Sequence, residues 1–522
     1  MNDLMQLWDQ HPVIPLVVFM FLCYLIGRKL KQSHETASAD LPRSESYNPS
    51  YTPSPAQGGL LARVLFHWSP RDPFTIGDLL RSLICFGASG SGKSTGSLYV
   101  IAKALAKCRK IGGLILASKP EDRTFWQKIF RDAGRIQDLI IFHPKNQWRF
   151  GFLDFIHKNG GDTKDIAEAI TVIGETLEQG EKNYRDKFWE KEPKRLIHNA
   201  VEIVKLAKGR VTAPDLHAFI TGAAMKPDTV NTPEFKESLH GKYLRAAYHN
   251  AKTSIERHDF GLAFNYFKDE YPAMADKMRS GILTSVLGIL HVFNSGIVRE
   301  LVSTTTNVSP TVFEEGKWIL ADLPISSFGA AGAFILGGFK YLTQRYILNR
   351  YAGEQTPATV IWCDEYQKVA NSFDPAFLAE CRSHRGCMVC ATQSIHSLYT
   401  RIQEAGEHGA DALLTSYFHK IFHALGDEKS ATYASSLIGR RLKTRVNVSS
   451  GGEDNAYDAL YGAPKITTNT SQSIETILEP REFMQGLRTG GRAHGYAVDG
   501  IVIRSEAFSN GENFLRVAFS QK

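Results

Sequence analysis

A glycine-rich loop that ends in a lysine carries the clearest chemistry in this sequence. Its members are Gly87, Ala88, Ser89, Gly90, Ser91, Gly92, Lys93, Ser94 and Thr95. Two glycines five positions apart, followed by Lys and Ser, are the pattern of a phosphate-binding loop. Glycines allow consecutive backbone N–H groups to turn inward around phosphate oxygens, and the helix that follows directs its positive end at the same oxygens. The loop therefore predicts a nucleoside triphosphate as the ligand.

The residues on either side of this loop have the pattern that a phosphate-binding loop requires. Leu83 to Phe86 form an apolar run that predicts a buried strand, and apolar residues recur at helical spacing from Leu98 to Leu105. Lys93 is then predicted to reach the β- and γ-phosphates, and the hydroxyl group of Ser94 is predicted to hold Mg²⁺. A glycine-rich turn with a chance lysine is the alternative, and the flanking strand and helix argue against it.

A second group of candidate residues ends another apolar run. Residues 360–363 predict a strand, and Asp364 and Glu365 follow it directly. A phosphate-binding loop alone binds nucleotide, whereas hydrolysis also needs a group that polarises water. We therefore predict that Asp364 helps to hold Mg²⁺, and that Glu365 orients and deprotonates the attacking water. A solvated acidic turn at the end of a strand is the alternative.

The next apolar run, residues 386–392, leads into Gln393. Because the carboxyl ends of neighbouring parallel strands face the same crevice, Gln393 is predicted to lie beside Asp364 and Glu365, close to the γ-phosphate. Arg382 and Arg385 precede this strand. Either could act as an arginine finger on the nucleotide of a neighbouring subunit. For each arginine, a solvated surface charge is the alternative.

The composition indicates a folded chain rather than a disordered one. The length of 522 residues predicts two or three domains. A content of 43% hydrophobic and 22% charged residues is typical of a folded, partly soluble protein. A net charge of +7 permits a nucleic-acid or anionic-lipid partner without requiring one. The seven cysteines show no disulfide framework, in keeping with a reducing compartment. No two histidines lie one residue apart, and no dense carboxylate cluster is visible, which argues against a relaxase or a two-metal nuclease.

The N-terminal region predicts a membrane anchor. Residues 13–27 are apolar and uncharged, and the basic residues 28–31 follow them. The run is near the lower limit for a membrane-spanning helix. A cleaved signal peptide is the alternative, but such a peptide carries its basic residues before the apolar run. Positive charges after the span place the bulk of the chain in the cytoplasm.

The remaining sequence divides into four further parts. Residues 32–58 are rich in Ser and Pro and predict a flexible linker. Short apolar runs predict buried parallel strands near 112–118, 138–144, 317–324, 358–366 and 386–394, besides the strand at 83–86. Between them, helical spacing predicts an all-α insertion at 161–300. The nucleotide-binding domain is therefore expected in two parts, 59–160 and 301–522, with a long helix near 329–350 in the second.

Together these features resemble a known family. A membrane anchor, the loop "GASGSGKS", a helical insertion, "WCDEY" and then "CRSHRGCMVCATQS" are similar to the type IV secretion coupling proteins of bacterial conjugation, which belong to the FtsK-type and HerA-type motors. The resemblance covers roughly residues 75–510. It implies a P-loop NTPase of the RecA-like, additional-strand catalytic-glutamate type. It also implies a homo-hexameric ring on the bacterial inner membrane, with one predicted span here where many members have two.

The resemblance assigns roles by position. Lys93 and Ser94 match the nucleotide-binding loop, Asp364 and Glu365 match the hydrolytic acids, and Gln393 matches the glutamine of the sensor strand. Arg382 falls where the family has its arginine finger. The segment 117–122 departs from the family pattern, because Ser118 stands in place of an aspartate and no glycine follows.

The implied function is a membrane-anchored ATPase that uses ATP and Mg²⁺ to move a relaxase–DNA complex into a type IV secretion channel. Inner-membrane components of that channel would be further partners. The alternative is a type IV secretion ATPase or receptor that recruits protein effectors without pumping DNA. The basic run at 439–445 could face a phosphate backbone, although a solvated loop is the preferred interpretation there.

Overall fold

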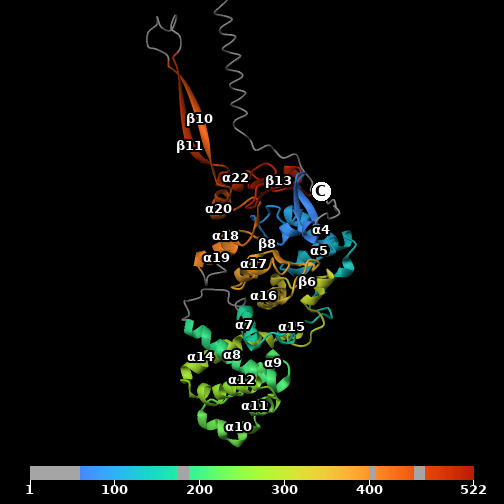
Figure 1. Ribbon diagram of the computed structural model, residues 1–522, viewed down its shortest axis with the longest axis vertical. Coiled ribbons are helices and arrows are strands. Elements are labelled where there is room, and N and C mark those ends of the chain that lie inside the picture. The colour runs from blue at the N-terminus through green and yellow to red at the C-terminus, as the bar shows by residue number, and fades with distance from the viewer. Residues whose placement is uncertain (1–58, 175–186, 400–405, 452–464, 522) are drawn as a thin grey trace, which may run out of the picture. The chain divides into compact units, whose positions relative to one another are not determined.

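The computed structural model describes residues 59–174, 187–399, 406–451 and 465–521, and their main feature is one nine-stranded sheet (Figure 1). The strand order is β13-β12-β9-β3-β8-β7-β4-β6-β5. The strands of this sheet are β3 (Leu83–Phe86), β4 (Ile111–Ala117), β5 (Leu139–Phe142), β6 (Trp318–Asp322), β7 (Ala358–Cys363), β8 (Gly386–Thr392), β9 (His419–Phe422), β12 (Ala497–Ile503) and β13 (Phe514–Ser520).

Seven of these strands, from β9 to β5, run parallel. Every residue of β3, β4, β6, β7 and β8 is buried, as expected for strands covered on both faces. The six predicted strands are all present, and their ends differ from the prediction by a few residues. β8 lies between β3 and β7, so an additional strand separates the strand before the phosphate-binding loop from the strand before Asp364.

Different elements cover the two faces of the sheet. On one face, α4 (Ser97–Lys107), α5 (Pro120–Asp132) and the hairpin of β1 (Val64–Ser69) and β2 (Asp72–Thr75) share a hydrophobic core with the sheet. On the other face, α16 (Ile325–Asn349) packs through Phe339 onto Phe142 of β5, with ring centroids 5.2 Å apart. α17 (Asp374–Glu380) contacts α16 on this side. The result is a three-layer α/β unit.

Between β5 and β6, the described residues form helices and no strand. They are α6 (Phe152–Lys158), α7 (Thr163–Gly174), α8 (Lys187–Lys208), α9 (Ala213–Thr221), η4 (Pro227–Asn231), α10 (Pro233–Glu237), α11 (Leu239–Asn250), α12 (Ser254–Asn265), η5 (Tyr266–Glu270), α13 (Tyr271–Ala273), α14 (Asp276–Phe293), α15 (Gly296–Val302) and η6 (Pro310–Glu315). Several of them gather around α8 in Figure 1, and their buried residues recur every three or four positions, as in Ile282, Val286 and Leu290 of α14.

The C-terminal part adds antiparallel structure that the sequence patterns did not predict. β12 pairs antiparallel with β9, and β13 pairs antiparallel with β12, so the chain end extends the sheet. A separate two-stranded ribbon consists of β10 (Arg440–Gly451) and β11 (Lys465–Thr476) (Figure 1). The prediction of a loop at 439–445 is therefore wrong. β10 pairs with β11 without interruption, from Arg440 opposite Thr476 onward, and this pairing holds the segment extended with its basic side chains exposed.

Shorter elements connect these parts. They are η1 (Leu60–Ala62), α3 (Ile76–Leu79), η2 (Ile136–Asp138), η7 (Tyr366–Lys368), α18 (Ile395–Tyr399), α19 (Gly406–Thr415), α20 (Glu428–Ile438), α22 (Pro480–Gln485) and η9 (Arg492–His494). The predicted helix near 329–350 is present as α16, but it starts earlier and is interrupted at Gly329, whose φ of 53° is not helical.

The predicted membrane anchor and linker lie outside the described residues. Within them, α16 is long and apolar enough to cross a membrane, but 61% of its most apolar window is buried inside the protein. α14 and α15 pass the same test only as a pair that is bent by 73°. Because α16 fills one face of the sheet, its apolar character follows from its place in the core.

Candidate functional site: a phosphate-binding loop facing two acids

The glycine-rich loop connects β3 to α4 at the carboxyl end of β3. Gly90 and Gly92 have φ values of 75° and 87°, in the left-handed region that glycine enters without strain. Lys93 reaches back across the loop, and its ammonium group donates to the carbonyl oxygens of Gly87 and Ala88, the latter at 3.1 Å. Burial lowers the pKa of Lys93, although the nearby Asp364 and Glu365 carboxylates oppose this effect.

The loop rests on the segment that follows β9. The backbone N–H of Ala88 donates to the carbonyl of Ala424 at 2.8 Å. The buried imidazole of His423 lies between the hydroxyl group of Ser97 on α4, at 2.7 Å, and the carbonyl of Asp499 on β12, also at 2.7 Å. Burial lowers the pKa of His423 to about 4, so the ring is neutral at pH 7 and can act as donor at one nitrogen and acceptor at the other.

The two acids lie immediately after β7, on the same edge of the sheet. Glu365 has φ 59° and ψ 47°, an uncommon conformation for a residue with a side chain. Its backbone N–H donates to the carboxylate of Asp364 at 3.0 Å, and the Ser118 hydroxyl donates to the carbonyl of Asp364 at 3.2 Å. Strained backbone of this kind persists where the surrounding structure imposes it, often at active sites.

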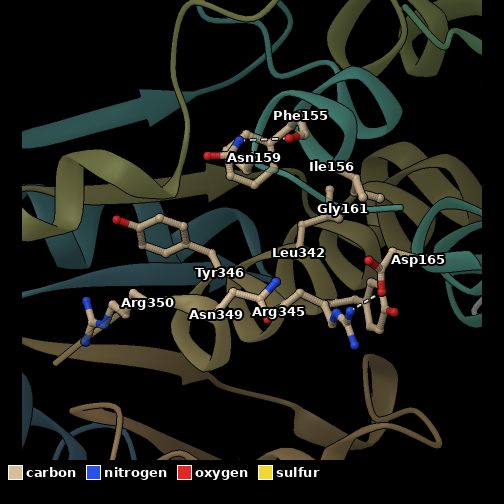
Figure 2. Close-up of a pocket in the computed structure, with 11 residues that line it drawn as sticks. Phe155, Ile156, Asn159, Gly161, Asp165, Leu342, Arg345, Tyr346, Asn349 and Arg350 are labelled. Atoms are coloured by element: carbon tan, nitrogen blue, oxygen red, sulfur yellow. Dashed lines mark hydrogen bonds and ion pairs between the residues drawn. The ribbon is translucent and has the colours of Figure 1, made fainter. Parts of the chain in front are cut away.

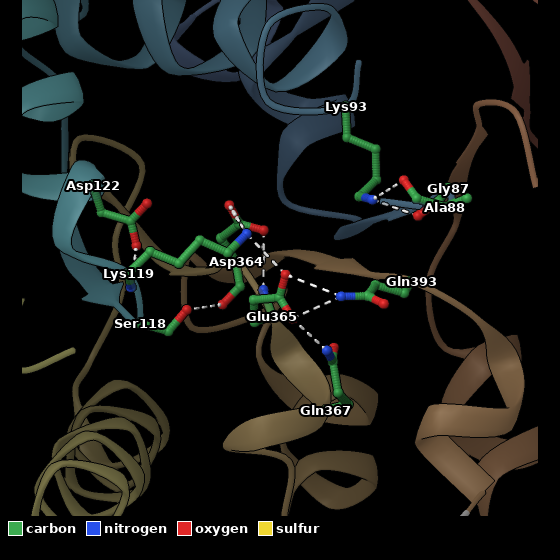
Figure 3. Close-up of polar contacts among 10 residues, drawn as sticks. All are labelled: Gly87, Ala88, Lys93, Ser118, Lys119, Asp122, Asp364, Glu365, Gln367 and Gln393. Atoms are coloured by element: carbon green, nitrogen blue, oxygen red, sulfur yellow. Dashed lines mark hydrogen bonds and ion pairs between the residues drawn. The ribbon is translucent and has the colours of Figure 1, made fainter. Parts of the chain in front are cut away.

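Three side chains hold the carboxylate of Glu365, as Figure 3 shows. The ammonium group of Lys119 lies 2.8 Å from it, the Gln367 amide donates to it at 2.6 Å, and the Gln393 amide lies at 3.3 Å. Burial raises the pKa of Glu365, but Lys119, Lys368 and Gln393 together outweigh this effect, and the net pKa is below the ordinary value. Glu365 is therefore ionised at neutral pH and can accept a proton.

Gln367 and Lys119 are the members of this site that the sequence patterns did not single out, and Lys119 is the charged one. It follows β4 and also lies 3.7 Å from the carboxylate of Asp364. Its backbone N–H donates to Asp122 at 3.0 Å, and burial, with a contribution from Asp364, raises the pKa of Asp122 to about 7. The available signal was its position, because β4 is a further parallel strand that ends at the edge where β3 and β7 end.

The structure does not bring the two candidate arginines to this edge. Arg382 and Arg385 precede β8, whereas Gln393 follows it, so they lie at opposite ends of one strand. The Arg382 side chain is exposed. Arg385 has φ 57°, and its carbonyl accepts from Arg350 and from the backbone of Thr359. Within one chain, neither arginine completes the site that contains Lys93 and Glu365.

A pocket of about 130 Å³ lies elsewhere, between α6, α7 and α16 (Figure 2). The two arginines in its lining are already engaged: Arg345 pairs with Asp165, and Arg350 donates to the carbonyls of His384 and Arg385. Phe155 and Tyr346 supply aromatic surface. This pocket lies between the first helices of the insertion and α16. Its lining residues include no glycine-rich loop and no pair of acids.

Comparisons with known proteins agree with this geometry. A family model described as "Type IV secretory system Conjugative DNA transfer" matches residues 53–308. A second, described as "TraM recognition site of TraD and TraG", matches residues 358–486, which contain the acid pair and Gln393. The chain belongs to the type IV coupling proteins. The predicted family is confirmed, and with it the predicted role in conjugative DNA transfer. No curated protein sequence matches this coupling protein.

Solved structures show the same fold. The unbound bacterial conjugative coupling protein TrwBdeltaN70 is 14% identical, with 90% of each chain covered and a TM-score of 0.60. Plasmid coupling protein TrwB with the non-hydrolysable GTP analogue GDPNP is 15% identical, covering 86% of this chain and 88% of that one, with a TM-score of 0.56. TrwB with ADP and Mg²⁺ is also 15% identical, with coverages of 86% and 87% and a TM-score of 0.56. The predicted α/β nucleotide-binding fold is therefore confirmed.

Proposed function

We propose that this coupling protein hydrolyses ATP at the site between Lys93 and Glu365 and uses the energy to drive DNA into a type IV secretion channel. The observation that carries the proposal is the meeting of a phosphate-binding loop and an ionised, hydrogen-bonded glutamate at one edge of the sheet. TrwB, which shares the fold, has been solved with ADP and Mg²⁺ and with a non-hydrolysable ATP analogue. The glycine-rich loop with Lys93 suits the phosphates of such ligands.

The donor set suits a hard cation. The Ser94 hydroxyl group and the Asp364 carboxylate offer oxygen atoms, which Mg²⁺ prefers, and these two residues would hold it. Bound Mg²⁺ supplies positive charge that stabilises the phosphate oxygens during transfer. Backbone N–H groups of residues 87–95 bind the phosphates, and the Lys93 ammonium group leaves its carbonyl partners for the β- and γ-oxygens.

Glu365 performs the proton transfer in this proposal. Its depressed pKa keeps it as carboxylate at neutral pH, so it accepts a hydrogen bond and then the proton of the attacking water. Gln393, which already contacts Glu365, orients that water and senses the γ-phosphate. Arg382 lies at the far end of β8 from Gln393, and, as the family position implies, it acts on the nucleotide of the neighbouring subunit.

Assembly and location complete the proposal. Residues 1–31 anchor the chain by a single span in the bacterial inner membrane, residues 32–58 link it to the cytoplasmic bulk, and six copies form a ring. Residues 59–160 and 301–522 form the nucleotide-binding domain, and residues 161–300 form an insertion that meets cargo. The relaxase–DNA complex and the inner-membrane proteins of the secretion channel are the proposed partners. The family assignment supports these statements by analogy.

The test is ATP turnover by the full chain in detergent, with and without single- or double-stranded DNA. Glu365→Gln keeps the hydrogen-bonding shape and removes the base, so turnover should fall at least about 100-fold while ATP binding persists. DNA-stimulated turnover that this variant abolishes would support the proposal. Turnover that DNA does not change would favour protein cargo. No turnover by assembled protein that binds ATP would refute the enzymatic role.

A further inference from the structure

The ribbon of β10 and β11 has no role in the proposed function. Each of its strands is 12 residues long, and the two pair in unbroken register. At about 3.4 Å per residue, the ribbon is roughly 40 Å long. Among the residues that the structure describes, it pairs with no other strand. A two-stranded ribbon alone in water is only marginally stable, whereas three or more strands with an apolar face are stable. The ribbon therefore has the character of one half of a larger sheet.

The contacts of the ribbon with the rest of the protein lie at its base, where β10 starts and β11 ends. Arg441 forms an ion pair with Glu512, which precedes β13. The hydroxyl group of Ser435 on α20 donates to the carbonyl of Leu478 at 2.5 Å. From there β10 and β11 extend away from α20 and α22, as Figure 1 shows. The faces and outer edges beyond the base are open to a partner.

One face of the ribbon carries large apolar side chains that contact solvent. Side chains alternate between the two faces of a strand, and residues directly opposite each other in a ladder share a face. Leu442 lies opposite Ile474, and Val446 belongs to the same face. The exposed fractions of Leu442, Ile474 and Val446 are 57%, 69% and 48%. An apolar strip of this kind on a narrow element marks a surface for a partner that offers apolar groups.

The opposite face of the ribbon is cationic. Arg441, Lys443 and Arg445 occupy alternate positions of β10, and their side chains are 60%, 56% and 59% exposed. Glu475 is the only acid of β11, and it lies 2.6 Å from Arg445 and 3.5 Å from Lys443. Exposed ion pairs contribute little free energy, so the carboxylates of a partner can replace Glu475 at low cost. This face therefore suits an acidic partner.

The charge changes sign along the ribbon. In the half next to the base, residues 440–445 hold four cations against Glu475, a net charge of +3. Residues 446–450 and 466–470 are uncharged. Residues 451–465, which join the two strands, have a net charge of −2, from Glu453, Asp454, Asp458 and Lys465. DNA or an anionic bilayer that lay along the ribbon would be repelled by this second part. The partner must instead carry both signs of charge.

The outer edge of β10 determines how such a partner can lie. β10 pairs with β11 on one side only, so its other edge offers unpaired backbone N–H and C=O groups. If a second β10 lay parallel and in register, cations would oppose cations, which is destabilising. If it lay antiparallel, the positive half of each copy would lie beside the negative segment of the other. The order of charges therefore fits a second copy of this chain.

We propose that the positive half of β10, residues 440–446, binds the acidic segment 452–464 of a second copy of this chain. The two β10 edges pair antiparallel, and the two ribbons form one four-stranded sheet in which every contact occurs twice. A two-fold contact uses the same surface on both copies and closes at two. It is therefore distinct from the ring of six copies in the proposed function, and it does not depend on a nucleotide.

The experiment detects this contact directly in the full chain. Equal amounts of unlabelled and heavy-nitrogen-labelled chain are diluted in detergent, concentrated together and treated with a carbodiimide, which joins an amine to a carboxylate in direct contact. After digestion with trypsin, Lys443 should be found joined to the peptide of residues 446–465. About half of these products should combine a labelled with an unlabelled peptide, because two equal populations pair at random across a two-fold contact.

Two charge-reversed variants test the complementarity. Lys443→Glu with Arg445→Glu makes the base of the ribbon acidic, and Asp454→Lys with Asp458→Lys makes the joining segment basic. Each variant alone should lose cross-linking between copies at least about 10-fold, because like charges then face each other. A mixture of the two variants has opposite charges at both ends of the contact, so cross-linking should recover to within about twofold.

A matched control changes the net charge equally at another place. Asp228→Lys with Glu234→Lys alters two exposed acids of the helical insertion and should leave cross-linking unchanged. Products confined to one isotope would show that the acidic segment contacts its own ribbon, which would overturn the proposal. Loss in both variants without recovery in their mixture would also overturn it.

A polyanion as the partner is a separate outcome. The unaltered chain and the variant with the acidic base are tested for binding to phosphatidylglycerol vesicles and to duplex DNA. If Lys443 gave no cross-link between copies, and only the unaltered chain bound one of these probes, the ribbon would belong to that polyanion and the proposal would fail. Since no step of the test uses ATP, its result is independent of the proposed function.

Discussion

At the scale of the residue, the central observation is that Lys119 shares the carboxylate of Glu365 with two glutamines. A buried carboxylate without a counter-charge has a raised pKa and a less defined position. Lys119 supplies that charge at 2.8 Å. We therefore regard Lys119 as a positioning residue that keeps Glu365 ionised and aimed at the phosphate-binding loop.

This role predicts different effects for two substitutions. Lys119→Ala should lower kcat for ATP hydrolysis about 10-fold, equivalent to ~1.4 kcal/mol, with a much smaller change in KM. Lys119→Arg keeps a cation on a stem of similar length, so it should retain activity within about threefold. Steady-state kinetics of the full chain measure both. An arginine variant as impaired as the alanine variant would show that charge at this position is not what matters.

The residue types alone made part of this site predictable. An apolar run that leads into the loop of Lys93, and another that leads into Asp364 and Glu365, revealed the phosphate-binding loop and the acid pair, because buried parallel strands leave their polar residues at the carboxyl edge. Lys119 follows the strand predicted near 112–118 and was open to the same argument, but only the packing of β4 beside β7 shows that it reaches Glu365. β12 was missed because antiparallel pairing with β9 depends on residues far apart in sequence.

At the scale of the element, α16 and α17 are joined by an ion pair that is fully buried. The Lys340 ammonium group contacts both oxygens of Asp374, at 2.6 and 2.5 Å, and both side chains are 0% exposed. Gln344 and Tyr366 also donate to Asp374, at 2.8 and 2.7 Å. Because Tyr366 is the residue after Glu365, this network fixes the backbone that carries the proposed base.

Breaking this pair should be costly. Lys340→Met leaves the Asp374 carboxylate buried without its cation, so the free energy of unfolding should fall by roughly 3–5 kcal/mol. Combining it with Asp374→Asn removes the uncompensated charge and should recover part of the loss. Thermal unfolding of the single and double variants measures this coupling. Strictly additive losses would mean that the two side chains do not depend on each other.

The helical insertion contains a buried histidine, His240, which should make the stability of the folded protein depend on pH. His240 on α11 is 0% exposed, and its ring stacks on Phe219 with centroids 4.0 Å apart. Burial lowers its pKa to about 4, although a hydrogen bond with the Phe219 carbonyl opposes this effect. Between about pH 6.5 and pH 4 the unfolded chain binds a proton that the folded chain does not, so stability should fall as the pH falls through this window.

His240→Phe keeps an aromatic ring and removes the titrating group. Relative to the unaltered chain, the variant should therefore gain stability progressively from pH 6.5 to pH 4, by up to ~3 kcal/mol. The midpoint of thermal unfolding across this range measures the effect, with the exposed His258→Phe on α12 as the control. Parallel pH profiles for the unaltered chain and both variants would contradict the assignment.

At the scale of the whole molecule, the site is assembled from segments that span most of the chain. Residues 87–95, 118–122, 364–393 and 423–424 meet because β3, β4, β7, β8 and β9 belong to one sheet. These segments all lie within the described residues, whereas the predicted anchor is assigned to residues 1–31, which precede them. Nucleotide binding and membrane attachment should therefore be separable properties of the molecule.

A chain that begins at Gly59 tests this separation. It should bind ATP as tightly as the full chain, within about twofold, and should move from the membrane fraction to the soluble fraction of a bacterial lysate. The physical reason is that α16, the apolar helix that remains, is mostly enclosed by the protein and has little surface to offer a bilayer. Sedimentation of the lysate after a carbonate wash, followed by ATP binding to the purified chain, measures both properties. If the shortened chain bound ATP normally but stayed in the membrane after the wash, the assignment of residues 1–31 as the anchor would fail. The attachment would then have to come from the remaining chain, and α16 or the bent pair of α14 and α15 would be the segments to examine.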